Sequence, residues 1–104
     1  MMMRPQVTIA KVSEDIIDLR GTLNFASVPS LKDAIVPFLS SLDKLTVNLS
    51  GVSYSDSTGL ALLSEWLRLV KAQNKVIEYI GMPEQMRAIA TVTGMCKILP
   101  IQDS

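Results

Sequence analysis

The sequence predicts an α/β fold in which helices cover a mixed sheet of four to five strands. Segments with alternating apolar residues are separated by segments with apolar residues at helical spacing, in the order β-β-α-β-α-β-α with a short apolar tail. Strands joined through helices pair in parallel, which adds parallel pairs to an initial hairpin. The chain has 104 residues, 48% of them hydrophobic, so we expect residues 1–104 to form a single domain around one core.

The first two strands are expected at residues 7–12 and 16–19. Apolar residues alternate through the first segment, and residues 13–15 form a polar turn between the two. We expect Gly21 to end the second strand. The short connection predicts an antiparallel hairpin.

A helix is expected next, because apolar residues recur at helical spacing from Val28 to Leu39. Ser27 is the candidate N-cap, and Pro29 stands where a first-turn proline is tolerated. Pro37 lies inside this run. Proline has no N–H and crowds the preceding turn, so it should kink or shorten the helix.

The middle of the chain predicts a strand, a loop, a long helix and another strand. Alternation predicts a strand over residues 45–49, followed by a loop over residues 50–56. The helix is expected over residues 57–73, and the next strand over residues 76–80.

The last helix is expected to open at Pro83 and to stop at Gly94, a residue that favours helix C-termini. Residues 98–101 form a short apolar tail. They are expected to be an edge strand or a packed extension of the core.

The charge balance and the cysteine count exclude several classes of function. Ten Lys and Arg residues stand against ten Asp and Glu residues, without the basic surplus of a nucleic-acid-binding protein. No apolar run approaches the roughly 20 residues needed to span a bilayer, and the first residues do not resemble a signal peptide, so direct membrane insertion is not expected. Cys96 is the single cysteine, which excludes an internal disulfide and favours a cytoplasmic location.

Enzymatic chemistry is not expected. The chain contains no histidine, the usual general base at neutral pH, and it lacks the Cys and His clusters of zinc or iron sites. No glycine-rich phosphate loop is present. The sequence therefore predicts a protein without catalytic residues, cofactor or metal.

The segment over residues 53–59 gathers hydroxyl side chains and one acid between a strand and a helix. One interpretation is helix capping, because Asp56 or Ser57 can accept hydrogen bonds from the first turn and an acid there suits the helix dipole. Capping needs only one such residue. A hydroxyl left over at this helix start would be accessible to a partner or to phosphorylation.

The long helix carries an unusually wide apolar arc, made of two adjacent stripes. The first consists of Leu60, Leu63, Leu67 and Val70, and the second consists of Leu62, Trp66 and Leu69. We favour a helix wedged inside the core, with part of the second stripe facing a partner as the alternative. The remaining arc has small or charged residues, namely Thr58, Ala61, Glu65, Arg68 and Ala72.

Residues 49–60 resemble the signature of STAS domains, in which a strand is followed by a D-S-[ST]-G-[LI] turn and a helix. Asp56-Ser57-Thr58-Gly59-Leu60 carries this turn, and Gly21-Thr22-Leu23 resembles the G-x-[LI] motif of the family after its second strand. The resemblance covers nearly the whole chain. It implies the STAS fold, which is also that of anti-sigma-factor antagonists.

Two subfamilies fit this resemblance, and the sequence favours the MlaB type. Residues 59–63, residues 93–95 and the tail at 98–101 resemble that subfamily, whereas antagonists more often have Gly at the position of Ala61. This implies a non-enzymatic STAS subunit that binds and supports a cytoplasmic ABC-transporter ATPase. That complex would move phospholipids to maintain outer-membrane lipid asymmetry, with the subunit held at the inner face of the inner membrane through its partner.

The alternative is an anti-sigma-factor antagonist. The family resemblance then makes Ser57 the phosphosite of a kinase anti-sigma factor, whose binding is blocked by the modification.

Both alternatives imply the same partner-binding residues at the start of the long helix. Gly59 is expected to let the partner approach the backbone, and Ser57 is the contact or switch hydroxyl. The full set of expected partner-binding residues is Asp56, Ser57, Thr58, Gly59, Ala61, Leu62, Glu65 and Arg68.

Overall fold

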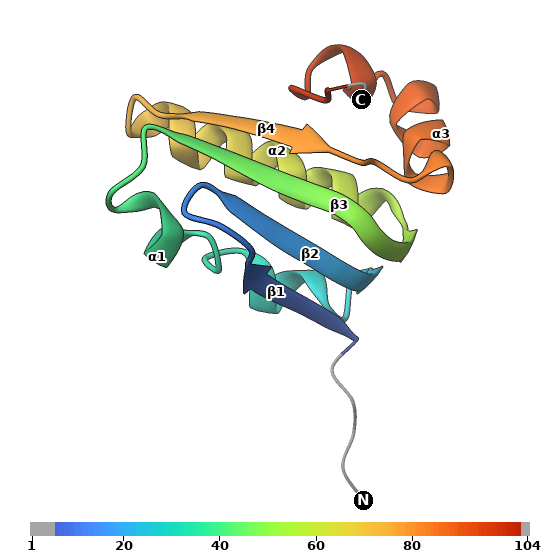
Figure 1. Cartoon of the computed structure of the whole chain (residues 1–104). Coiled ribbons are helices and arrows are strands. Elements are labelled where there is room, and N and C mark those ends of the chain that lie inside the picture. The colour runs from blue at the N-terminus through green and yellow to red at the C-terminus, as the bar shows by residue number, and fades with distance from the viewer. Residues whose placement is uncertain (1–5, 103–104) are drawn as a thin grey trace, which may run out of the picture.

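The computed structural model describes residues 6–102 and orders four strands and three helices as the sequence predicts (Figure 1). The first residues, for which no signal peptide is expected, lie largely outside this range. The strands are β1 (Val7–Lys11), β2 (Ile16–Leu23), β3 (Lys44–Ser55) and β4 (Val76–Ile80). The helices are α1 (Val36–Leu39), α2 (Ser57–Ala72) and α3 (Glu84–Val92), with 3₁₀ turns η1 (Val28–Leu31) and η2 (Met95–Lys97).

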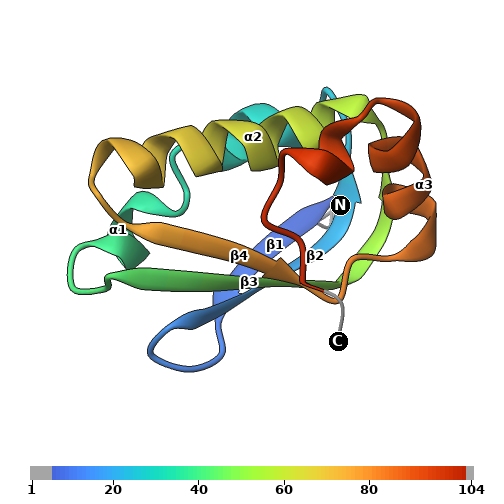
Figure 2. The same ribbon diagram turned by 90° about the horizontal axis from the view of Figure 1, so that it is seen from above.

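The sheet has the order β1-β2-β3-β4 and is mixed, as predicted. The hairpin pair β1–β2 is antiparallel, and β2–β3 and β3–β4 are parallel. Each parallel pair is joined by a crossover that contains helix, because parallel neighbours cannot be joined by a tight turn. The helices lie on one side of the sheet (Figure 2), so the chain folds as a helical layer on a sheet.

The core fills the space between α2 and the inner face of the sheet. Trp66 is fully buried, and its indole N–H donates to the carbonyl oxygen of Leu31 at 3.1 Å. Tyr79 of β4 is also fully buried, and its hydroxyl donates to the carbonyl oxygen of Leu63 at 2.6 Å. Both polar groups are therefore satisfied inside the core, as burial of polar atoms requires.

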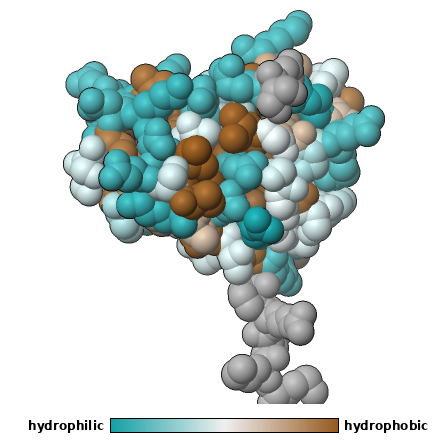
Figure 3. Space-filling view, viewed as in Figure 1, coloured by the Kyte–Doolittle hydropathy of each residue, from teal (hydrophilic) through white to brown (hydrophobic). Residues whose placement is uncertain are grey.

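The opposite face of the sheet carries polar networks in place of helices. Asp18 accepts hydrogen bonds from Arg20 and Asn48, each at 3.0 Å. Glu78 accepts from Thr46 and pairs with Lys44 at 3.2 Å. The view onto this face mixes hydrophilic and hydrophobic side chains (Figure 3), which is typical of a mixed sheet with one solvated face.

A continuous helix from residue 27 to Leu39 is not formed, because the chain forms η1 and α1 with turns between them; the expectation that Pro37 shortens the helix is confirmed. Pro37 has no N–H to offer the carbonyl of Asp33, which instead accepts from Val36 at 3.1 Å. Ser27 does stand at the N-cap position of η1, as predicted, but its side chain makes no capping hydrogen bond. It is buried, and its hydroxyl donates to the carbonyl oxygen of Thr22 at 2.7 Å.

Two strands are longer than predicted. Gly21 does not end β2, since its φ of +107° lies in a bulged part of the strand where glycine tolerates the backbone. A Cβ at Gly21 would lie 2.1 Å from the carbonyl oxygen of Gln6. The loop predicted over residues 50–56 is likewise wrong, because β3 keeps pairing with β2 as far as Ser55.

The rest of the order is confirmed. The structure places α2 and β4 within a residue of their predicted bounds, and α3 follows Pro83. Gly94 has a φ of +78° just after α3, the left-handed conformation of a helix stop. The tail is a packed extension, in which Leu99 is buried and Ile101 bridges to Tyr79.

Tyr79 predicts a loss of stability at alkaline pH. Burial raises the pKa of its hydroxyl above the ordinary 10.0, so the folded state keeps a proton that the unfolded chain releases above pH 10. The free energy of unfolding should fall by about 1.4 kcal/mol per pH unit above that value. Tyr79→Phe should be less stable at neutral pH by about 1 kcal/mol, because it loses one hydrogen bond.

Urea unfolding of the wild type and of Tyr79→Phe tests this prediction. The free energy of unfolding is measured between pH 8 and pH 11, in steps of about half a pH unit. The difference in stability between them should shrink as the pH rises past the ordinary tyrosine pKa. A constant difference across that range would show that Tyr79 does not control the alkaline transition.

Candidate partner-binding site

The candidate site lies where β3 ends and α2 begins, at the edge of the sheet where the parallel strands β2 and β3 both end (Figure 1). Leu23 pairs with Ser55 at this edge, and the carbonyl oxygen of Leu23 accepts from the Asp56 N–H at 3.0 Å. The ends of both strands therefore fix where α2 starts. In α/β folds such an edge is where ligands and partners are bound most often.

Asp56 is the N-cap of α2. Its backbone is extended, with φ −97° and ψ −170°, and its Oδ1 accepts from the Thr58 N–H at 2.8 Å. The Thr58 hydroxyl donates to the same oxygen. One carboxylate thus satisfies a free amide of the first turn and adds favourable charge at the positive end of the helix. The capping interpretation is confirmed for Asp56, so Ser57 is left over.

Ser57 carries the available hydroxyl of the motif. Its side chain is exposed and makes no hydrogen bond within residues 6–102. Ser55, in contrast, is fully buried and donates to the carbonyl oxygen of Asp56 at 2.9 Å. Thr58 is occupied by Asp56. Of the two hydroxyl side chains in the D-S-T-G turn, only that of Ser57 is therefore unoccupied and exposed.

The structure places Ala61, Glu65 and Arg68 on the outer face of α2 with Ser57. Ala61 and Arg68 are exposed, and Glu65 is partly exposed. Residues four apart lie one above the other on a helix, so Ser57, Ala61 and Glu65 form one line. Glu65 pairs with Arg68 at 3.2 Å, a surface ion pair that contributes little to stability.

Two shallow apolar cavities flank Ala61. The larger has a volume of about 400 Å³ and is lined by Val28, Pro29, Lys32, Thr58, Ala61, Leu62 and Glu65. The smaller has a volume of about 220 Å³ and is lined by Ser57, Leu60, Ala61, Thr93 and Met95. Because Ala61 has only a methyl group, it separates the two cavities without filling either. The face can therefore receive two separate side chains of a partner.

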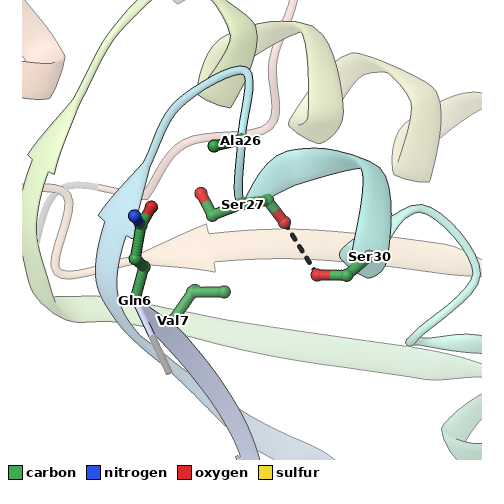
Figure 4. A pocket seen from close by; sticks show the side chains of 5 residues that line it. All are labelled: Gln6, Val7, Ala26, Ser27 and Ser30. Carbon is green, nitrogen blue, oxygen red and sulfur yellow. Dashed lines mark hydrogen bonds between the residues drawn. The ribbon is translucent and has the colours of Figure 1, made fainter. Parts of the chain in front are cut away.

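A third cavity, of about 250 Å³, lies elsewhere, beside β1 and η1 (Figure 4). It is lined by Gln6, Val7, Ala26, Ser27 and Ser30. Its two serines are already satisfied, since the Ser30 hydroxyl donates to the carbonyl oxygen of Ser27 at 2.8 Å. No predicted site residue lines it, so we do not assign it a function.

The predicted role of Gly59 is wrong. Gly59 is buried, and a Cβ there would lie 2.1 Å from the Ser55 hydroxyl oxygen and 2.9 Å from the Leu23 Cβ. Glycine is therefore needed so that α2 can approach the strands of its own chain, and a partner cannot reach it.

Leu62 is only 2% exposed, and a partner could touch it only through the larger cavity, which it helps to line. Trp66 of the same stripe is fully buried. Leu69 packs partly buried against the core. The favoured core interpretation of the second stripe is confirmed.

The sequence did not reveal the walls of the two cavities, which come from segments far away in the chain. Val28 has no local motif that marks it, and the pattern over residues 93–95 indicated a subfamily without indicating that Met95 lies beside Ser57. One exposed aromatic side chain was also missed, since Phe25 is 78% exposed just after β2; Tyr54, inside the predicted segment over residues 53–59, is 49% exposed near the end of β3. Aromatic residues are enriched in protein interfaces, but neither residue lines the two cavities beside Ala61.

Within the described residues, no group of three or more His, Cys, Asp and Glu side chains could hold a metal ion. None of the helices in residues 6–102 has the length and apolar character to cross a membrane.

Comparisons with known proteins point to one family. A Bacillus subtilis protein, named anti-sigma-B factor antagonist, is 28% identical over 100 residues, covering 95% of this chain and 92% of that protein. The anti-sigma factor antagonist SpoIIAA in its unphosphorylated form superposes with a TM-score of 0.72 at 17% identity, covering 94% of this chain and 87% of that one. A putative anti-sigma factor antagonist from Thermotoga maritima superposes with a TM-score of 0.74 at 19% identity, covering 94% and 86%.

The two solved structures share the fold of this chain. A family model described as "Mlab, STAS domain" matches residues 8–100. The chain therefore belongs to the STAS domain family.

Proposed function

We propose that this protein is an antagonist of a kinase-type anti-sigma factor, which it binds through the face of α2 around Ser57. The observation that carries this proposal is the exposed Ser57 hydroxyl, which is unbonded and stands directly after the Asp56 cap. Phosphorylation of Ser57 by the partner would then end the interaction. Such a cycle belongs in the cytoplasm and needs no cofactor bound to this chain.

The relatives support this proposal over the Mla-type one that the sequence favoured. The Bacillus subtilis and Staphylococcus epidermidis relatives are both named anti-sigma-B factor antagonists, and each is 28% identical to this chain. Ala61, which favoured the Mla type, separates two cavities and is compatible with either partner. We therefore place the antagonist function first.

A phosphate on Ser57 would act by repulsion and desolvation. It adds a charge of about −1.5 to −2 at pH 7. The Thr58 N–H already bonds to Asp56 Oδ1, and the Gly59 N–H bonds to the Asp56 carbonyl oxygen at 3.1 Å. These amides are not free to hold the phosphate, and the Asp56 carboxylate repels it. The phosphate would project from the face between the two apolar cavities and oppose docking of the partner.

The test is a phosphorylation assay with the purified protein, ATP and the kinase-type anti-sigma factor of the same cell, followed by mapping of phosphopeptides. We expect phosphate on Ser57 and no incorporation in Ser57→Ala. Ser53→Ala is the matched control, because Ser53 is an exposed serine of the same motif, and it should be modified like the wild type. Phosphate on Thr58 or Ser53, or no phosphate at all, would contradict the proposal.

The second candidate is a subunit that supports an Mla-type ABC-transporter ATPase in phospholipid transport, favoured by the description of the matching family model. It would use the same face without modification. A tagged pull-down from the native cell separates the two functions. Recovery of an ABC ATPase with unmodified Ser57 would favour the subunit, whereas recovery of a kinase-type anti-sigma factor would favour the antagonist.

A further inference from the structure

The side chain of Gln85, at the start of α3, binds both backbone groups of Ser55. Its Oε1 accepts from the Ser55 N–H at 2.9 Å, and its Nε2 donates to the Ser55 carbonyl oxygen at 2.7 Å. The planar carboxamide of a glutamine has one C=O acceptor and an NH₂ group with two donors. A peptide group is also planar and has one C=O acceptor and one N–H donor. Gln85 therefore bonds to Ser55 as a neighbouring strand would.

This pairing replaces a strand that is missing at this position. β4 pairs with β3 only as far as Asn48, which lies opposite Ile80, while β3 continues to Ser55. Beyond Asn48, the β4 side of β3 has no strand partner among the described residues. Backbone groups at such a strand end need partners from water or side chains. Gln85 supplies them at the last residue before the site.

The backbone position of Ser55, which Gln85 fixes, in turn determines the position of the site residues. Its buried hydroxyl donates to the carbonyl oxygen of Asp56, and the Asp56 N–H bonds to Leu23 of β2. Gly59 packs so closely on Ser55 that even a Cβ would collide with its hydroxyl oxygen. The position of Ser55 therefore sets where the Asp56 cap and Ser57 stand.

We propose that Gln85 is a positioning residue, which fixes Ser57 and ties α3 to the partner-binding face. The same α3 segment continues to Thr93 and Met95, which line the smaller cavity beside Ser57. The Gln85 contact thus adds a polar link between the two walls of that cavity to the core packing of Met86 and Ala90. Its effect on partner binding rests on the proposed function, whereas its effect on the backbone does not.

The geometry separates this role from core stability. The Gln85 residue is exposed and is not part of the hydrophobic core, so its replacement leaves that core in place. Gln85→Met keeps the length and helix propensity of the side chain but removes its donor and acceptor. Gln73→Met is the matched control, since Gln73 is exposed at the other end of α2 and its side chain makes no hydrogen bond within the described residues.

The first experiment uses the free protein, with NMR of its backbone amides. In Gln85→Met we expect the Ser55 amide to exchange with solvent roughly tenfold faster, because it loses its acceptor. The amide shifts of Asp56 and Ser57 should move as well, and none of these changes should occur in Gln73→Met. Faster exchange at Ser55 with unchanged signals at Asp56 and Ser57 would overturn the positioning role.

The second experiment measures affinity for the kinase-type anti-sigma factor by calorimetry. Gln85→Met should bind about three- to tenfold more weakly, as expected for a site held by one or two fewer hydrogen bonds. Unchanged affinity, despite moved Ser57 signals, would overturn the functional part of the proposal. If the wild-type protein itself does not bind this partner, the proposed function fails, and the NMR result alone decides the role of Gln85.

Discussion

A Ser57→Asp variant is expected to bind its protein partner roughly a hundredfold less tightly than the wild type, which corresponds to about 3 kcal/mol. Ser57 is exposed on a face whose neighbours are Ala61 and two apolar cavities. A partner that covers this face would strip water from the new carboxylate and leave it next to the Asp56 carboxylate. Desolvation of an unpaired charge and repulsion between like charges both oppose binding.

The same substitution should not harm the fold, which makes the prediction specific. Ser57 is the first residue of α2, where an acidic side chain interacts favourably with the helix dipole. The melting temperature of Ser57→Asp should therefore stay close to that of the wild type while its affinity falls, because the favourable helix dipole offsets the repulsion from Asp56. Binding is measured by calorimetry, and stability by thermal unfolding followed by circular dichroism.

Two further variants control this experiment. Ser57→Ala removes the hydroxyl without adding charge and should retain most of the affinity. Ser50→Asp adds the same charge at an exposed serine in the middle of β3 and should bind like the wild type. If Ser57→Asp binds as tightly as Ser57→Ala, the partner does not cover Ser57, and both the antagonist and the transport-subunit functions lose their proposed interface.

The parts of the fold that the sequence predicts well are those with strong local signals. α2 begins at Ser57 because Asp56 caps it and apolar residues repeat at helical spacing behind it. The second half of β3 was missed because its pairing with β2 is long-range and passes two register shifts. Bulges disrupt the alternation from which a strand is predicted. For the segment from Val28 to Leu39 the sequence predicts too much regular structure. Its apolar residues recur at helical spacing, but the chain forms no continuous helix there.

The residues of the candidate site also differ in how well the sequence predicts them. Asp56 and Ser57 could be predicted because the motif that names them is contiguous. Gly59 was given the wrong role, since a glycine needed for close approach looks the same in sequence whether it faces a partner or its own chain. Gln85 carries no motif at all. Its role exists only because α3 folds back to the end of β3, 30 positions earlier in the chain.

Gly59→Ala is expected to lower the free energy of unfolding by about 1–3 kcal/mol, the usual cost of overpacking a core. The new Cβ would lie 2.1 Å from the Ser55 hydroxyl oxygen, and Ser55 is fully buried and hydrogen-bonded, so it cannot easily move. Alanine is a better helix former than glycine by about 1 kcal/mol. Without the collision, the same substitution would therefore stabilise α2.

Ser55→Ala removes the colliding oxygen and allows a double-mutant test, measured by urea unfolding of the four proteins. Ser55→Ala alone should cost about 1 kcal/mol for its lost hydrogen bond. The double variant should be more stable than the sum of the two single changes predicts, with Leu23 limiting full recovery. Gly94→Ala is the control, because Gly94 has open space around it and a left-handed backbone, so its cost should add to that of Ser55→Ala without coupling.

Partner affinity then decides between the two roles of Gly59. If Gly59 served to admit a partner, as the sequence suggested, Gly59→Ala would weaken binding while leaving stability intact. The structure predicts that Gly59→Ala lowers stability and that the double variant regains partner affinity. In the double variant the colliding oxygen of Ser55 is gone, so Ser57 returns toward its wild-type position. If the losses in the free energy of unfolding at positions 55 and 59 simply add, α2 does not pack directly against Ser55. The proposal that Gln85 positions Ser57 through Ser55 would then be contradicted as well.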